Sequence, residues 1–250
     1  MNAIRSFIYV IWLYSWMAVL GILALPTLLL PRSAILWFIR LYARTVVLGL
    51  RLICGIQVEF RGEEHVSGGP LLIAGIHQAM LDVFVPFLIF KDPVLVMKRE
   101  LLWYPVLGWY ALKTRMLAID RSGQAKTMRK MLAAAEARVN GESRQMLIYP
   151  EGTRSLPGAA PDYKPAGVRA FYKTLGVPMV PLATNSGLCW PARGMVRTPG
   201  KVVYEVLPPL ASDMNPKAVL AALETELEAA SERLLDEGLL AQGRTRADLQ

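Results

Sequence analysis

The first fifty residues contain two long apolar stretches. Residues 7–30 carry no charged side chain, and a helix of that length measures about 36 Å, enough to cross a bilayer core of ~30 Å. A cleaved signal peptide is the alternative, but its apolar core would be shorter, and no small-residue cleavage site precedes Pro31. The pattern therefore favours a retained membrane span over about residues 7–30.

The second stretch, about residues 34–54, places Arg40, Arg44 and Arg51 on one side of a helix. At about 100° per residue these three lie within about 40° of one another. This pattern is typical of an amphipathic helix in the membrane interface, since three arginines make a second span costly. The side chains expected in lipid are Trp37, Phe38, Leu41 and Val47.

From residue 55 onward, short apolar runs alternate with helical and loop patterns, which predicts one α/β domain over residues 55–250. Strands are predicted at 55–60, 70–75, 93–97, 116–119, 145–149, 177–184 and 201–207. Helices are predicted at 83–90, at 124–139, and from Asn215-Pro216 to about Asp236. Two prolines favour an edge position or an irregular start for the strand at 177–184. The tail after Gly238 is expected to be frayed.

Composition and charge agree with membrane contact. Hydrophobic residues make up 54% of the 250 and mean hydropathy is +0.34, which is apolar for a globular protein. The net charge is +8, and the first 58 residues contain five arginines and no acid, which favours anionic lipid over nucleic acid as the partner. One arginine precedes the first apolar stretch and four follow it, so we expect the domain of residues 55–250 to face the cytoplasm.

Residues 91–173 contain 15 basic and 7 acidic side chains, a surplus that predicts an anionic substrate. The two cysteines, Cys54 and Cys189, lie far apart in apolar contexts with no CxxC pattern. Reduced, buried thiols are therefore expected, and no metal site or disulfide.

His77 follows the predicted strand at 70–75 directly, where open α/β sheets place their ligands. A neutral imidazole can accept a proton from a hydroxyl, and a nearby carboxylate can hold the ring in the required tautomer. Asp82, five residues on, is the candidate carboxylate, although a packed pair without catalytic work is the alternative. The other histidine, His65, lies in a polar loop without such a partner.

Polar residues also follow the other predicted strands. They are Lys98-Arg99-Glu100, Asp120-Arg121 and Pro150-Glu151-Gly152-Thr153-Arg154-Ser155. Arg154 offers a planar, two-pronged donor suited to phosphate. Residues 101–113 are aromatic and apolar, which fits either plain core or a wall for an acyl chain.

These clusters resemble the motifs of the glycerophospholipid acyltransferase family, in family order, over roughly residues 55–210. The first is His77-Gln78-Ala79-Met80-Leu81-Asp82, the second is Lys98-Arg99-Glu100-Leu101 with Ile119-Asp120-Arg121, the third is Tyr149 to Ser155, and the fourth is Val177-Pro178-Met179-Val180-Pro181. The resemblance implies a mixed sheet flanked by helices, behind the membrane-anchoring residues 1–54.

The resemblance also implies acyl transfer from an acyl carrier protein or coenzyme A thioester to the sn-2 hydroxyl of 1-acyl-sn-glycerol-3-phosphate, which forms phosphatidic acid. It makes His77 the general base and Asp82 its orienting partner. Glu151, Gly152, Thr153 and Arg154 would bind the acceptor's glycerol phosphate, assisted by Lys98 and Arg121. No metal or other cofactor is expected, because a thioester is already an activated acyl group.

The chain departs from the family pattern at two positions. Ala79 stands where many relatives have serine, and Ile76 stands where asparagine often precedes the histidine. The motif thus offers no serine nucleophile, which favours direct transfer. Two alternatives stay open: another acceptor such as lyso-ornithine lipid, and a lipid-binding protein with a degenerate site.

Overall fold

The computed structural model describes residues 1–119, 125–211 and 213–249. Within them a seven-stranded sheet runs in the order β1-β7-β6-β2-β5-β3-β4. Its strands are β1 (Ile56–Arg61), β2 (Leu71–Gly75), β3 (Pro93–Lys98), β4 (Leu117–Ile119), β5 (Gln145–Ile148), β6 (Met179–Thr184) and β7 (Gly200–Val206). Every neighbouring pair is parallel except β6 with β7, so the mixed sheet expected from the sequence is confirmed.

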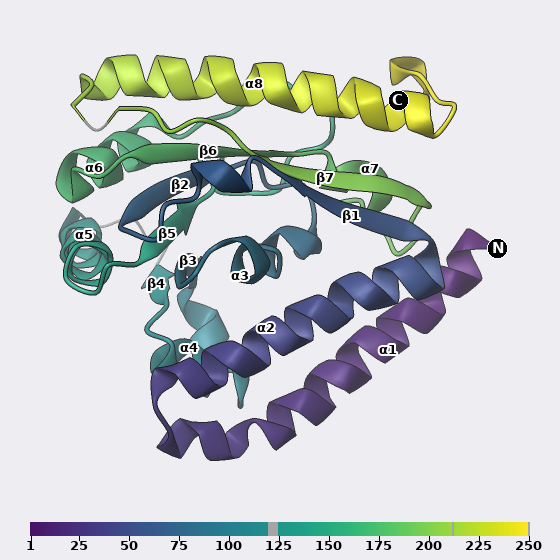
Figure 1. Ribbon diagram of the computed structural model, residues 1–250, viewed down its shortest axis with the longest axis horizontal. Helices are drawn as coiled ribbons and strands as arrows, with labels where there is room; N and C mark the ends of the chain where they lie inside the picture. Colours follow the sequence, from purple (N-terminus) through teal and green to yellow (C-terminus); the bar gives the residue numbers. More distant parts are fainter. Residues whose placement is uncertain (120–124, 212, 250) are drawn as a thin grey trace.

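The sheet is parallel around β2, and β2 is apolar throughout because both of its faces are covered. One face packs against α5 (Ala125–Val139), α6 (Pro165–Leu175) and the long α8 (Pro216–Ala241). The other face packs against α1 (Asn2–Leu23), α2 (Arg32–Gly49) and the short α3 (Pro86–Ile89). Figure 1 shows these layers, with α8 along one side of the sheet and α1 and α2 along the other.

The remaining helices are short. They are α4 (Leu107–Lys113), α7 (Ser186–Cys189), a π-helical turn over Leu50–Cys54, and 3-10 turns at Leu25–Leu29, Glu63–His65, Met80–Val83, Arg99–Trp103 and Arg246–Leu249.

Helices α1 and α2 form an antiparallel pair that packs on the domain as well as on each other (Figure 1). Tyr9 of α1 is fully buried, and the guanidinium of Arg197 lies 4.9 Å from the centre of its ring. At the start of α2, Arg32 forms an ion pair of 2.6 Å with Asp92, which precedes β3. These contacts fix the orientation of the pair relative to the sheet.

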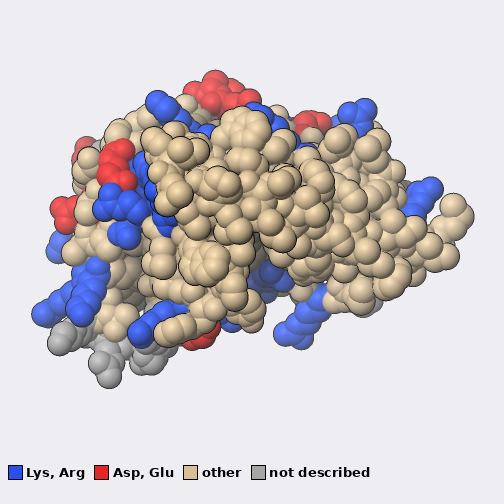
Figure 2. Space-filling model, turned by 90° about the horizontal axis from the view of Figure 1, so that it is seen from below, with Lys and Arg blue, Asp and Glu red and all other residues tan. Residues whose placement is uncertain are grey.

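The outward side of the helix pair is apolar. Exposed residues there include Phe7, Ile8 and Ile11 of α1, and Trp37 and Leu48 of α2. Figure 2 shows this side of the molecule as a broad surface without charged residues, with lysine and arginine mostly at its margins. Both Asn2–Leu23 and Arg32–Cys54 are long and apolar enough to cross a membrane, a property they share with some core helices and signal sequences.

Several expectations need correction. The strand at 177–184 is not at an edge, because β6 lies between β2 and β7. The sheet accommodates Pro181 because regular pairing with β7 begins only at Leu182, and Met179 meets Leu210 in an isolated bridge. The irregular start expected from the prolines is therefore confirmed, and the edge position is wrong.

Two further boundaries differ from the sequence pattern. The helix predicted at 83–90 is only one turn long, because Pro86 starts a new helix after a 3-10 turn. The tail is not frayed at Gly238, since α8 continues to Ala241. Arg246 beyond it folds back onto Asp236 at 2.8 Å.

Candidate active site

The polar clusters that follow the parallel strands meet at one edge of the sheet, as the sequence predicted. β2, β5, β3 and β4 run parallel to one another, so their carboxyl ends lie at the same edge. His77 follows β2, residues 150–155 follow β5, and Lys98, which is exposed, ends β3. Arg121 lies outside the described residues.

His77 and Asp82 are brought together. The imidazole Nδ1 lies 2.9 Å from Asp82 Oδ2, and the His77 side chain is 14% exposed. A carboxylate accepts, so the nitrogen facing it carries the hydrogen and Nε2 keeps its lone pair. The ring is therefore held in the tautomer that a general base requires, with Nε2 directed away from the aspartate.

Asp82 is buried, yet hydrogen bonds satisfy both carboxylate oxygens. Besides His77, Oδ2 accepts from the backbone N–H groups of Gln78 at 2.7 Å and Ala79 at 2.8 Å. Oδ1 accepts from the hydroxyls of Ser186 at 2.7 Å and Tyr204 at 2.6 Å. Five donors offset the cost of burying this charge. They also fix the carboxylate that holds the imidazole.

The segment between the two residues explains their spacing. Met80–Val83 forms a 3-10 turn that places Asp82 three residues after its N-cap, Ala79. An acid at this position reaches back to the N-cap N–H, which is half of a capping box. The same turn brings the carboxylate under His77, so four intervening residues suit both purposes.

Tyr149, the last residue before the proline of the third motif, packs on the catalytic candidate. Its ring stacks on His77 with centroids 4.2 Å apart, and its hydroxyl donates to the backbone carbonyl of Asp82 at 2.5 Å. Burial, reinforced by the negative charge of Asp82, raises the pKa of Tyr149 well above its usual value. The hydroxyl therefore remains a donor at neutral pH.

The loop after β5 is tied to the histidine segment through its far end. Ser155 donates from its backbone N–H to the carbonyl of His77 at 2.8 Å. Thr153 and Arg154 are exposed, and the positive charge of Arg154 lowers the pKa of the Tyr149 hydroxyl against the stronger effect of burial. Gly152, also exposed, has φ of +69°, a conformation that favours glycine.

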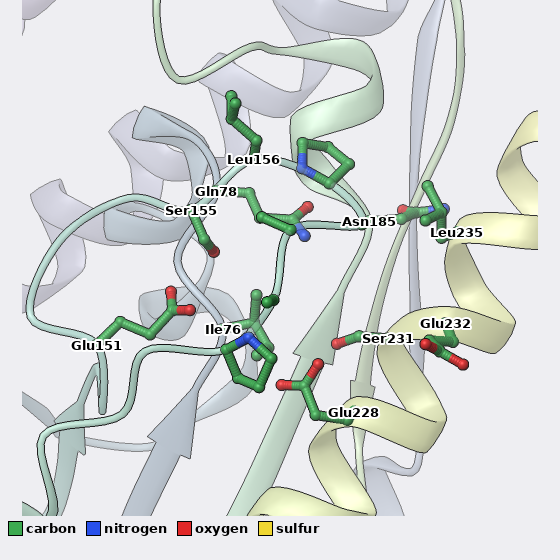
Figure 3. Close-up of a pocket in the computed structure, with 15 residues that line it drawn as sticks. Ile76, Gln78, Glu151, Ser155, Leu156, Asn185, Glu228, Ser231, Glu232 and Leu235 are labelled. Carbon is green, nitrogen blue, oxygen red and sulfur yellow. The ribbon is translucent and has the colours of Figure 1, made fainter. Parts of the chain in front are cut away.

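Glu151 lines a cavity that Arg154 does not line. It is 7% exposed, and the cavity, of about 230 Å³, lies between residues 155–161, the end of β2 and α8. Figure 3 shows its carboxylate in this cavity with Glu228 and Glu232 of α8. Ile76 and Gln78 also line it. Since successive side chains of an extended segment alternate, His77 between them faces the other way.

The structure gives a role to Tyr149, which the sequence pattern placed only at the start of the third motif, and adds Ser186 and Tyr204, which the pattern did not single out. No local signal identifies Ser186 or Tyr204, since each reaches Asp82 from more than 100 residues away. His65 does not join the site; its nearest acid, Glu64, is 3.9 Å away and exposed. Within the described ranges, no group of three or more His, Cys, Asp or Glu side chains is arranged to hold a metal ion.

The structure also bears on the remaining expectations from the sequence. Both cysteines are free and buried, as expected. The stretch 101–113 is largely not core, since Trp103 is 82% exposed and Tyr104, Trp109 and Leu112 are also exposed. Arg40, one of the three arginines on one side of the predicted amphipathic helix, donates to the backbone carbonyls of Phe87 and Lys91.

Comparison with known proteins agrees with this site. An acyltransferase family model matches residues 57–185, which include both residues of the dyad and the loop after β5. The 1-acyl-sn-glycerol-3-phosphate acyltransferase of Pseudomonas aeruginosa is 30% identical over 91% of this chain and 89% of its own length. The enzyme of the same name from Limnanthes alba is 30% identical over 64% of this chain and 56% of its own.

Among solved structures, the 1-acyl-sn-glycerophosphate acyltransferase of Thermotoga maritima has the same fold. It superposes with a TM-score of 0.78 over 94% of this chain and 98% of its own, at 20% identity. The match includes most of the chain and so extends beyond the region of the family model. By the family model and by the extent of its likeness to the Pseudomonas protein, this chain belongs to the acyltransferase family.

Proposed function

We propose that the chain transfers a fatty acyl group from an acyl carrier protein or coenzyme A thioester to the sn-2 hydroxyl of 1-acyl-sn-glycerol-3-phosphate, forming phosphatidic acid. The observation that carries the proposal is the dyad, in which Asp82 holds Nδ1 of His77 and leaves Nε2 as the base. The names of the relatives supply the acceptor. No metal or cofactor enters the proposal.

In the proposed reaction, His77 Nε2 takes the proton from the sn-2 hydroxyl while the oxygen attacks the thioester carbonyl. The imidazolium that forms is stabilised by the charge of Asp82. Collapse of the tetrahedral intermediate breaks the C–S bond, and the leaving thiolate recovers the proton from the imidazolium. The products are the ester and the free thiol, and the histidine returns to its starting state.

Arg154 is the residue that we assign to the acceptor's phosphate, with Gly152 and the side chain of Thr153 beside it. A guanidinium suits a phosphate because it donates in pairs. Lys98, at the end of the neighbouring strand β3, adds positive charge at the same edge, and we assign Arg121 to this role from the resemblance of its motif alone. Glu151 is directed into the acidic cavity, so its part in acceptor binding would be to position the loop rather than to meet the phosphate.

Residues 1–54 would hold the domain of residues 55–250 on the cytoplasmic side of the inner membrane. The apolar outer side of α1 and α2 and the arginines of α2 support this arrangement. It would let a lysolipid reach the site from the leaflet while a soluble thioester arrives from the cytoplasm.

The test is an assay of purified, full-length protein in detergent with a panel of lysolipids and both thioesters, with products identified by mass spectrometry. His77→Ala should reduce kcat by about 10²-fold or more, because general bases contribute 10²–10⁴-fold. His65→Ala is the matched control and should keep full activity. Near-normal turnover by His77→Ala would contradict the proposed mechanism.

A second variant tests the acceptor. Arg154→Ala should raise KM for 1-acyl-sn-glycerol-3-phosphate far more than KM for the thioester, and Arg154→Lys should recover part of the loss. Preference for lyso-ornithine lipid, or binding of lysolipids without turnover by the wild-type protein, would replace the proposed acceptor or the proposed activity.

A further inference from the structure

A cavity of about 360 Å³ lies on the side of the sheet that faces α1 and α2, away from the acidic cavity of Figure 3. It is lined by residues of α2, α3 and β1, and Figure 1 shows α3 beside α2. Its lining combines two guanidiniums with four apolar side chains: Arg40, Arg44, Val47, Phe60, Phe87 and Leu88. We call this space the arginine groove.

The two arginines differ in how they are held. Arg40 donates from Nε to the carbonyl of Phe87 at 3.3 Å and from a terminal nitrogen to the carbonyl of Lys91. These partners are uncharged, so they fix the guanidinium without neutralising it. Arg44, one helical turn further on, is exposed and makes no hydrogen bond or ion pair within the described part of the chain.

The acids on neighbouring elements are already engaged. Glu59 of β1 is 2.7 Å from Arg61 and 2.9 Å from Lys201. Asp92, after α3, is 2.6 Å from Arg32 and 3.1 Å from Arg144. The positive charge of Arg40 and Arg44 is thus left uncompensated by these two carboxylates, and the groove attracts an anion.

The apolar side chains of the lining indicate that the anionic ligand also carries an apolar part. Val47, Phe60, Phe87 and Leu88 offer a surface on which a hydrocarbon chain would be removed from water. A free anion such as inorganic phosphate would leave this surface unused. One anionic group joined to a chain uses both parts of the lining.

The position of the groove on α2 indicates the source of such a ligand. At about 100° per residue, Arg44 lies within about 40° of both Trp37 and Leu48, which are exposed on the outer side of the helix pair. The groove therefore opens beside the apolar surface seen in Figure 2. A lipid of the leaflet that receives this surface would have its phosphate at the level of the guanidiniums.

From this combination we infer that the arginine groove binds one anionic phospholipid of the leaflet, with its phosphate on Arg40 and Arg44 and part of one acyl chain along Val47, Phe60 and Phe87. The inference rests on the proposed membrane association. It is separate from the acceptor site, which lies at the carboxyl edge of the sheet. The groove is nevertheless linked to the dyad, because Phe60 packs 6.4 Å from the ring of Tyr204, which donates to Asp82.

Native mass spectrometry of the full-length protein from nonionic detergent tests the inference without any thioester. Dioctanoyl phosphatidylglycerol should bind as a single equivalent, and dioctanoyl phosphatidylcholine at least several-fold more weakly because its ammonium meets two arginines. Millimolar inorganic phosphate should not displace the bound lipid. Displacement by phosphate, or equal binding of both lipids, would overturn the inference.

Variants locate the bound lipid. Arg44→Gln should weaken phosphatidylglycerol binding about tenfold, since hydrogen bonds to a charged group are the strong ones. Arg51→Gln is the matched control, because Arg51 is an exposed arginine just beyond α2 that does not line the groove. Equal losses in the two variants would mean general surface attraction and would refute a specific site.

Val47→Trp tests the apolar half by filling the groove. It should reduce lipid binding even though both arginines are retained, provided that its thermal midpoint matches the wild type. Where Val47→Trp lowers the midpoint, Leu88→Asn replaces it and should show the same loss. Unchanged lipid binding in the folded variant would show that the acyl chain of the lipid does not lie in the groove. Failure here leaves acyl transfer untouched, since catalysis is measured separately through His77.

Discussion

At the scale of single residues, the site depends on one buried carboxylate. Asp82 accepts five hydrogen bonds from residues in three separate parts of the sequence. Two of the donors, Ser186 and Tyr204, touch only the oxygen that faces away from His77. They hold the aspartate so that the aspartate can hold the histidine, and we expect them to act as positioning residues.

Tyr204→Phe should therefore affect both stability and turnover. Loss of one hydrogen bond to a charged group is expected to cost about 1–3 kcal/mol of unfolding free energy and to lower kcat several-fold, with KM for both substrates nearly unchanged. Denaturant titration and steady-state kinetics measure the two effects.

Tyr172→Phe is the matched control, because the hydroxyl of this buried tyrosine donates to the carbonyl of Ala211, outside the site. It should lose stability without losing turnover. An equal fall of kcat in both variants would mean that Tyr204 has only a structural role.

Glu228 in the acidic cavity predicts a dependence of stability on pH. Burial raises the pKa of this carboxyl, with added effects of Glu151, Glu224 and Glu232, and the hydrogen bond from Tyr163 opposes the shift. The folded state then keeps the proton to a higher pH than the unfolded state. Stability is therefore lost as pH rises from the usual glutamate pKa through the raised one.

Glu228→Gln removes this titration and keeps an oxygen that can accept from Tyr163. Its thermal midpoint should equal that of the wild type near pH 4.5 and exceed it at pH 8. Glu226→Gln, on the exposed side of α8, should show no such difference. A constant difference between Glu228→Gln and wild type across this range would contradict the assignment.

At the scale of elements, local sequence signals set where helices start, and packing sets how far they run. Asn215 caps α8 by accepting from the N–H of Lys217 at 2.9 Å, with Pro216 in the first turn. The polar pattern suggested an end near Asp236, but α8 runs to Ala241 because Leu239 is buried in the core.

Asn215→Ala should lower the free energy of unfolding by about 1 kcal/mol, the usual cost of losing an N-cap. The midpoint of thermal unfolding should fall by about 2–4 °C. Asn215→Ser keeps a capping oxygen and should stay close to wild type. Identical losses in the two variants would show that the cap does not stabilise this helix.

At the scale of the whole molecule, the apolar helix pair and the α/β domain are packed into one unit. Tyr9 of α1 is buried against Arg197, and Arg32 of α2 pairs with Asp92. The uncharged surface of Figure 2 belongs to this unit, so contact with the membrane would fix the orientation of the site relative to the leaflet.

Fractionation of cells that produce the protein should find it with the membranes after washes with 1 M salt and with alkaline carbonate. Detergent should release it in active form, because the contact is apolar as well as electrostatic. Release by salt alone would mean that the arginines, rather than the apolar surface, hold it. Recovery in the soluble fraction would contradict membrane association.

Much of the fold and of the site could be predicted from local patterns. All seven strands lie close to where the sequence predicted them. Central strands such as β2 and β5 are short apolar runs because both of their faces are buried, whereas the residues of β1 alternate between apolar and polar. The pairing of His77 with Asp82 was predictable as well, since one 3-10 turn is enough to join them. Clusters at parallel strand ends were expected at a common edge, and among the described residues His77, Lys98 and residues 150–155 lie at that edge.

The sequence by itself thus determined the strands, the dyad and the two apolar helices, because each depends on residues close together in the chain. Only the tertiary structure decided that Tyr204 and Ser186 support Asp82, that Glu151 lines a cavity that Arg154 does not line, and that Arg40 and Arg44 border a groove with α3. Sheet order sets these contacts, and no local periodicity encodes which distant strand becomes a neighbour. Pro181 illustrates the difference. The sequence shows that this residue lacks a backbone N–H, but only the structure shows that the pairing of β6 with β7 begins after it, which lets the proline lie inside the sheet.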